Sequence, residues 1–265
     1  MALFESHFFS DTLGLSVSCH VLLPQQTQRQ IGMDGSGRSA AIPTLYLLHG
    51  LSDDHTIWMR RTSIERYAAA RGIAVVMPAV GRSFYQNTAS GTRYWSYISE
   101  ELPRLMQQFF RLSPAREDNF AAGLSMGGYG ALRLALACPD RFVAAASLSG
   151  ALDVQDRIDH AGREGSRMDP AELRGVFGQD LAFAHSEADL FQLAQTLTES
   201  PAQHPDLFIC CGTEDHLLPN SRKFHDHLTT LNYPHTYNQG PGDHHWDYWD
   251  AEIQTVLKWL PIRQS

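Results

Sequence analysis

Gly123-Leu124-Ser125-Met126-Gly127 stands between two segments of different character. Residues 119–122 before it are apolar and typical of a short strand, whereas residues 128–137 after it are rich in alanine and leucine and predict a helix. A serine between a strand and a helix occupies a sharp turn, and the flanking glycines remove side chains that would clash there. We expect the turn to lift the Ser125 hydroxyl clear of the sheet, near a helix N-terminus that favours anionic charge.

The pattern G-x-S-x-G between a strand and a helix is the nucleophile elbow of α/β-hydrolases. The bare pattern also arises by chance, so it is a hypothesis that needs partner residues in the right chain order. On this basis we predict an α/β-hydrolase fold, with a mostly parallel central sheet, helices on both faces and a small cap insertion.

Length and composition indicate one globular domain over residues 1–265, since 43% of the residues are hydrophobic and 19% are charged. The formal net charge of −8 and the absence of a basic run argue against nucleic-acid or anionic-membrane partners. No apolar run reaches membrane-spanning length and no signal-peptide pattern is visible, which predicts a cytoplasmic protein.

Cysteine and histidine spacing gives no sign of a disulfide framework or a metal centre. The four cysteines, Cys19, Cys138, Cys210 and Cys211, are expected to be buried thiols in a reducing compartment. The histidines lack zinc-site spacing, and no phosphate-binding glycine motif is present. We therefore expect no metal and no other cofactor.

Hydrophobic patterning predicts the remaining elements. An antiparallel pair at a sheet edge is expected at residues 3–10 and 15–23, and buried strands at 44–48, 73–78, 142–148, 206–212 and 236–238. Helices are expected at 64–71, 96–111 and 219–231, and after the loop that ends at Trp246. Polar residues 25–41 predict a mobile surface loop, and the polar stretch 151–204, with short helical pieces and no clear strand, predicts the cap.

The strand at 44–48 ends in His49-Gly50-Leu51, where glycine lets the chain bend. In α/β-hydrolases the corresponding loop donates one oxyanion-hole N–H, and the residue after the nucleophile donates the other. The predicted donors are therefore Leu51 and Met126. His49 is expected to orient this loop by hydrogen bonds rather than to act as a base.

An acid and a base follow in the order Ser…Asp…His that α/β-hydrolases use. Asp215 lies just past the strand at 206–212. Glu214 is the alternative, although the G-x-x-D spacing favours Asp215. After the last predicted strand, a glycine-rich loop carries His244 and His245, and either histidine could reach Ser125.

These motifs together resemble the putative esterase family, which includes tributyrin esterase and the esterase D or S-formylglutathione hydrolase group. The motifs are L-H-G-L-S-D-D at 48–54, Trp58, G-L-S-M-G-G-Y-G-A at 123–131, C-G-T-E-D at 211–215 and G-D-H-H-W at 242–246. The resemblance covers nearly the whole chain and implies Ser125, Asp215 and His244 as the catalytic triad. It prefers His244 because the family histidine stands two residues before an aromatic residue, here Trp246. It also implies Leu51 and Met126 as oxyanion donors.

The resemblance implies a serine carboxylesterase that hydrolyses short-chain acyl esters of small molecules through an acyl-enzyme. The acid motif is closer to tributyrin esterase than to S-formylglutathione hydrolase, which is the first alternative. An acyltransferase of the mycolyltransferase type and a non-catalytic binding module are the other two. Aromatic residues on the last helix would support a homo-oligomer if they are exposed, but they fit the protein core equally well.

Overall fold

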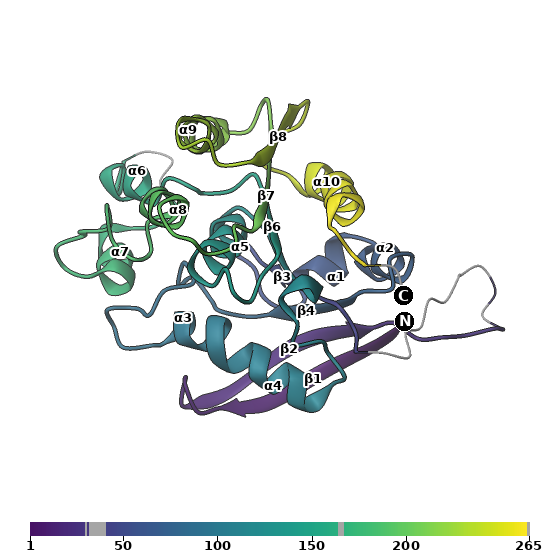
Figure 1. The fold of residues 1–265 in the computed structure, drawn as a ribbon. Coiled ribbons are helices and arrows are strands. Elements are labelled where there is room, and N and C mark those ends of the chain that lie inside the picture. Colours follow the sequence, from purple (N-terminus) through teal and green to yellow (C-terminus); the bar gives the residue numbers. More distant parts are fainter. Residues whose placement is uncertain (30, 32–40, 164–166, 264–265) are drawn as a thin grey trace.

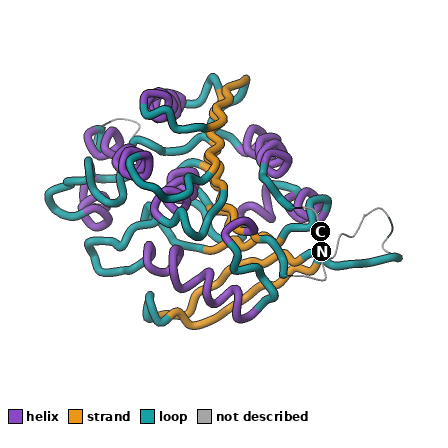
Figure 2. The backbone as a smooth tube through the Cα atoms, viewed as in Figure 1, coloured by secondary structure: helices purple, strands orange, loops and turns teal. Residues whose placement is uncertain are grey.

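The computed structural model describes residues 1–29, 31, 41–163 and 167–263. An eight-stranded sheet with strand order β1-β2-β4-β3-β5-β6-β7-β8 runs through the molecule (Figures 1 and 2). The strands are β1 (Ala2–Ser10), β2 (Leu15–Leu23), β3 (Thr44–Leu48), β4 (Ala74–Pro78), β5 (Asn119–Leu124), β6 (Ala144–Leu148), β7 (Asp206–Gly212) and β8 (His235–Gly240).

Strand β2 pairs antiparallel with β1 and with β4, and the pairs from β4 across to β8 are all parallel. The predicted mostly parallel sheet with an antiparallel edge pair is therefore confirmed. Because the strands from β3 to β7 are covered on both faces, they appear in the sequence as continuous apolar runs rather than as alternating patterns.

Helices cover both faces of this sheet. They are α1 (Ile57–Arg61), α2 (Ile64–Ala69), α3 (Tyr94–Ser96), α4 (Leu102–Phe109), α5 (Met126–Ala137), α6 (Val154–Asp159), α7 (Pro170–Phe177), α8 (Leu190–Thr198), α9 (Leu218–Thr230) and α10 (Trp246–Trp259). Buried side chains of α1, α2 and α10 pack with one face, and those of α4, α5, α8 and α9 pack with the other. On β3, Leu45 and Leu47 lie on the face that α1, α2 and α10 cover. Tyr46 and Leu48 lie on the opposite face.

The helix expected at 96–111 is interrupted. A π-helical turn at Tyr97–Glu101 joins α3 to α4 just before Pro103, which has no backbone N–H to donate to that preceding turn. Helix α1 was not expected from the sequence, because its five residues are too few to show a helical period.

The expected cap contains α6, α7 and α8, and no strand lies among its described residues. A hydrogen bond links this cap to α5. The buried hydroxyl of Tyr129 in α5 donates to the carbonyl of Ala188 in the cap at 2.7 Å, and it accepts from Gln86 Nε2 at 2.8 Å. The loop predicted at 25–41 lies mostly outside the described residues, so its mobility stays a prediction.

The aromatic side chains of α10 belong to the core rather than to an exposed surface. Tyr248 and Trp249 are buried, and Trp246 and Trp259 are partly buried against the same core. These residues therefore give no support for a homo-oligomer.

All four cysteines are free thiols, three buried and Cys138 half-buried. No helix of the described residues is both long and apolar enough to cross a membrane. The single-domain organisation and the cytoplasmic location stay predictions.

Candidate active site

Ser125 stands at the turn between β5 and α5 with φ 52° and ψ −117°, a backbone conformation that L-residues rarely adopt. Close packing around the turn requires the flanking glycines. A Cβ atom at Gly123 would lie 2.4 Å from the Gly127 carbonyl oxygen, and one at Gly127 would lie 2.5 Å from the Leu48 carbonyl oxygen. The Ser125 N–H donates to the Leu148 carbonyl at 3.0 Å, which ties the turn to the neighbouring strand β6.

Ser125, His244 and Asp215 form a hydrogen-bonded chain. His244 Nε2 lies 3.1 Å from Ser125 Oγ, and His244 Nδ1 lies 2.9 Å and 3.1 Å from the two carboxylate oxygens of Asp215. An ionised carboxylate only accepts, so Nδ1 carries the proton that it donates to Asp215. Nε2 is then left as the acceptor for the Ser125 hydroxyl. The three residues follow β5, β8 and β7, so three separate loops meet over one end of the sheet.

The Asp215 carboxylate is 4% exposed and well supplied with donors. Besides His244, the Leu217 N–H donates to Asp215 Oδ1 at 2.8 Å, and His216 Nδ1 lies 3.4 Å from the same oxygen. Burial acts to raise the pKa of Asp215, but the hydrogen bond and charge of His244 and the Leu217 N–H outweigh it, so the pKa lies below its usual value. Asp215 is therefore ionised at neutral pH and can stabilise a charged His244.

The two alternatives left open by the sequence, Glu214 and His245, lie outside this chain. Glu214 points to solvent and accepts from the Gly242 N–H at 2.6 Å, which holds the loop that carries His244. His245 is exposed, and its Nδ1 accepts from the Asp247 N–H at the start of α10. The structure thus brings together the three residues that the resemblance implies.

The loop after β3 approaches Ser125 closely. A Cβ atom at Gly50 would lie 2.7 Å from Leu124 Cδ1 and 3.8 Å from the Cβ atom of Ser125, so a larger residue there would require Leu124 to shift. Leu51 and Met126 both line the pocket at Ser125. Met126 is the first residue of α5, where a backbone N–H has no intrahelical partner. The position of both expected oxyanion donors beside Ser125 is consistent with that role, which stays a proposal.

His49 holds this loop in place, as expected. Its Nδ1 donates to the Gly50 carbonyl at 2.7 Å and its Nε2 accepts from the Val80 N–H at 3.0 Å. The Tyr85 hydroxyl donates to the His49 carbonyl at 2.9 Å. Burial lowers the pKa of His49 to about 4. Both ring nitrogens are thus engaged by the backbone, so His49 is not placed to act as a base.

The sequence model of the family described as "Putative esterase" matches residues 10–260. The chain belongs to this family. An acetyl esterase of Caldicellulosiruptor saccharolyticus is 27% identical over 266 residues, which cover 98% of each chain. The fluorophosphonate-binding serine hydrolase F of Staphylococcus aureus, solved with substrate bound, is 36% identical, with a TM-score of 0.87 and 99% of each chain covered. An S-formylglutathione hydrolase of the same organism is also 36% identical, with a TM-score of 0.83 and 98% of each chain covered.

This esterase therefore has the predicted α/β-hydrolase fold, and it is a carboxylic ester hydrolase. Its Ser125 opens into a pocket of about 230 Å³. The wall on the α10 side is aromatic. His244 packs edge-on against Trp249 with ring centroids 4.9 Å apart, and Trp249 packs against Trp246 at 5.2 Å.

Three basic side chains, Arg82, Arg157 and Arg167, also line this pocket. His216 lines it as well and packs on His244 with ring centroids 4.6 Å apart, and burial lowers the pKa of His216. Sequence reasoning missed these four residues, since no motif or spacing marks them.

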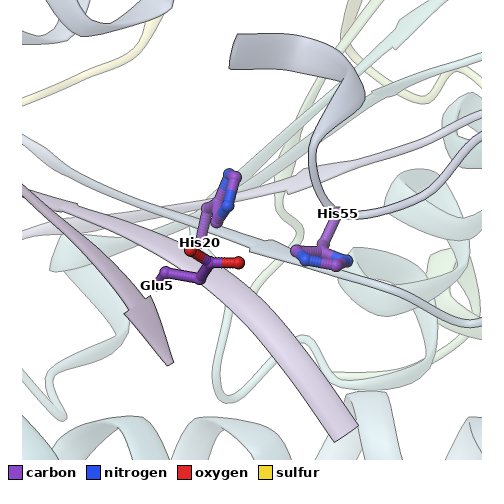
Figure 3. A group of neighbouring side chains, drawn as sticks. All are labelled: Glu5, His20 and His55. Carbon is purple, nitrogen blue, oxygen red and sulfur yellow. The ribbon is translucent and has the colours of Figure 1, made fainter. Parts of the chain in front are cut away.

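Two groups of described side chains have donor atoms close enough to hold a metal ion, with all donor atoms within 4.8 Å of one another. One is Asp215, His216 and His244, so an ion there would compete with the hydrogen bond between His244 and Asp215. The other is Glu5, His20 and His55, which come from β1, β2 and the loop before α1 (Figure 3). None of these last three lines the pocket at Ser125.

The burial of His49 predicts a loss of stability in mild acid. The pKa of histidine in an unfolded chain is ~6.5, so between pH ~6.5 and about pH 4 the unfolded chain binds a proton that the folded chain does not bind. The contribution of His49 to the free energy of unfolding is therefore complete above pH ~6.5 and decreases as the pH falls toward 4, by about 2 kcal/mol at about pH 5. Urea unfolding at about pH 7.5 and about pH 5 measures this loss.

The variant His49→Gln lacks the titrating group and serves as the comparison. It is expected to be less stable than the wild type at about pH 7.5, because it loses buried hydrogen bonds, but to lose about 2 kcal/mol less on acidification. An equal loss in both proteins would contradict the account of His49.

Proposed function

We propose that this protein is a serine carboxylesterase that hydrolyses short-chain acyl esters. Ser125 attacks the ester carbonyl while His244 Nε2 takes the hydroxyl proton and then returns it to the leaving alcohol. Asp215 orients the imidazole and stabilises its charged form. Water, activated by the same histidine, then hydrolyses the acyl-enzyme and regenerates Ser125. The observation that carries this proposal is the continuous hydrogen-bonded chain from Ser125 Oγ through His244 to Asp215.

The N–H groups of Leu51 and Met126 are the proposed donors to the oxyanion that forms on the carbonyl. Their support is their place in the lining beside Ser125 and the location of Met126 at the start of α5. A donor fixed before the reaction costs no reorganisation, and losing one typically slows such reactions about 100- to 1000-fold.

A small pocket supports a preference for short acyl groups. Its volume of about 230 Å³ lies below the ~300–1,000 Å³ typical of sites for drug-sized ligands. The second candidate, a thioesterase acting on S-formylglutathione, is favoured by the solved S-formylglutathione hydrolase at 36% identity. A formyl group would also fit a small acyl site.

Two matched pairs of variants test the triad. Asp215→Asn is expected to lower kcat by about 10⁴-fold and His244→Ala by at least as much. Their sequence neighbours Glu214→Gln, whose amide oxygen can still accept from the Gly242 N–H, and His245→Ala are expected to stay within about threefold of the wild type. Hydrolysis of p-nitrophenyl acetate measures kcat, and circular dichroism checks the fold. A large loss in His245→Ala with little loss in His244→Ala would overturn the assignment.

A panel of p-nitrophenyl esters from acetate to palmitate tests the acyl preference. We expect kcat/KM to be greatest between acetate and butyrate and to fall for longer chains, because acyl carbons beyond the pocket remain in water and gain nothing. Higher activity on palmitate than on butyrate would contradict the proposal. S-formylglutathione, assayed alongside, would favour the thioesterase candidate if its kcat/KM exceeded that of every oxygen ester by about 100-fold or more.

A further inference from the structure

The pocket at Ser125 is cationic although the whole chain carries a formal net charge of −8. Among its described lining residues, Arg82, Arg157 and Arg167 are basic and Asp53 is acidic. The basic side chains thus outnumber the acidic one. A cleft with an excess of one charge sign concentrates ligands of the opposite sign, so this pocket favours anionic ligands.

The arginines differ in their partners. Arg82 forms an ion pair with Glu172, and its Nη2 also donates to the Arg167 carbonyl at 2.7 Å. In the part of the chain that the structure describes, the guanidinium groups of Arg157 and Arg167 have no ion pair or hydrogen bond.

Acidic side chains of the same region are engaged elsewhere. Asp153 binds Lys223, and Asp156 Oδ1 lies 3.2 Å from His160 Nδ1. The charge of Asp156 still acts favourably on Arg157, but neither carboxylate forms an ion pair with the guanidinium group of Arg157 or Arg167 among the described residues.

Arg157 and Arg167 also repel each other. Arg157 is half-buried, and burial followed by the charge of Arg167 lowers the pKa of its guanidinium, although arginine stays protonated in proteins. Arg167 is exposed, so the cost falls mainly on the half-buried Arg157, and an anion bound between the two guanidinium groups would reduce their repulsion. A guanidinium group presents a planar pair of donors that matches a carboxylate, which makes arginine suited to that ligand.

We propose that Arg157 and Arg167 form a subsite for a carboxylate carried by the ester, so that the preferred substrates are short esters bearing an acidic group. This inference rests on the proposed serine esterase function and adds the substrate class. The acid can belong to the acyl half or to the leaving half of the ester.

Two matched pairs of substrates distinguish these halves. Mono-p-nitrophenyl glutarate and its methyl ester differ by one carboxylate on the acyl half, and 4-acetoxybenzoate and its methyl ester differ by one carboxylate on the leaving half. For at least one pair, the wild type is expected to hydrolyse the acidic ester with about 10-fold or higher kcat/KM, through a lower KM. Added salt should reduce this ratio.

Variants locate the subsite. Arg157→Gln and Arg167→Gln are each expected to lower the ratio of acidic to neutral kcat/KM by about 10-fold or more, whereas Arg174→Gln, an exposed arginine of α7 outside the pocket, leaves the ratio unchanged. A wild-type ratio near unity for both pairs, or an equal fall in Arg174→Gln, would overturn the subsite. Failure to hydrolyse the neutral esters would instead count against the proposed function.

A second inference rests on the group Glu5, His20 and His55. Glu5 and His20 are directly opposite each other in the β1–β2 pair, and the rings of His20 and His55 have centroids 5.0 Å apart. His20 Nδ1 is buried and has no hydrogen-bond partner among the described residues. A buried polar atom without a partner calls for a water or an ion to satisfy it.

We infer that these three side chains bind a divalent metal ion of the Zn²⁺ type, since two imidazoles and one carboxylate are a donor set that Zn²⁺ accepts, with water completing the coordination. Figure 3 shows the carboxylate of Glu5 beside the two imidazoles. Glu5 Oε1 also lies 3.8 Å from His7 Nε2, and this contact would be lost when the ion binds. The ion would link the edge pair of strands to the loop that follows β3, and thereby brace the segment that carries Leu51.

Calorimetric titration with Zn²⁺, and the visible absorption of bound Co²⁺, test this inference. One equivalent is expected to bind the wild type and to raise its Tm. His55→Gln should weaken binding by about 100-fold or more, while His216→Gln, which breaks the other donor group, retains it. No binding to the wild type, or binding lost in His216→Gln and kept in His55→Gln, would overturn the site.

Discussion

The backbone of Ser125 is held at a positive φ by the packing around it, and the rest of the site is arranged about that turn. Residues on three sides enforce the conformation. The Gly127 and Leu48 carbonyls lie where Cβ atoms at the two glycines would stand, and β6 accepts the Ser125 N–H. A strained residue persists only where its surroundings over-determine it. The strain exposes the hydroxyl above the sheet and starts α5 directly behind it.

Parallel pairing explains why residues far apart in the chain meet at this turn. The carboxyl ends of β3, β5, β7 and β8 lie along one edge of the sheet, so the loops that follow them share one space. The register of β7 and β8 pairs Gly212 with Gly240, which brings the loops of Asp215 and His244 together. The hydrogen bond from the Gly242 N–H to Glu214 then fastens one loop to the other. Glu214, the sequence neighbour of Asp215, thus helps to hold the loop that carries His244 in position.

Much of this arrangement could be predicted from the sequence, because the residues concerned lie at fixed offsets from buried strands. Ser125 and Asp215 each follow such a strand, and His49 adjoins another. The choice between His244 and His245 needed the family resemblance, since both lie on one loop and only their contacts in the folded chain distinguish them.

Other features had no signal in the sequence. Arg157 and Arg167 come from a polar segment without periodicity, and Glu5, His20 and His55 come from three segments that only the fold brings together. The sequence pattern of α10 also does not predict which of its aromatic residues are buried, because they occur around much of the helix surface.

The central claim is that Ser125 is the nucleophile and that His244 activates it. Intact-protein and peptide mass spectrometry after treatment with a fluorophosphonate measures this directly, since such a reagent captures an activated serine hydroxyl without any choice of substrate. The account predicts one adduct on the peptide that contains Ser125, formed rapidly in the wild type and in His245→Ala and slowly in His244→Ala. An adduct on another residue, or equally fast labelling of Ser125 in His244→Ala, would contradict it.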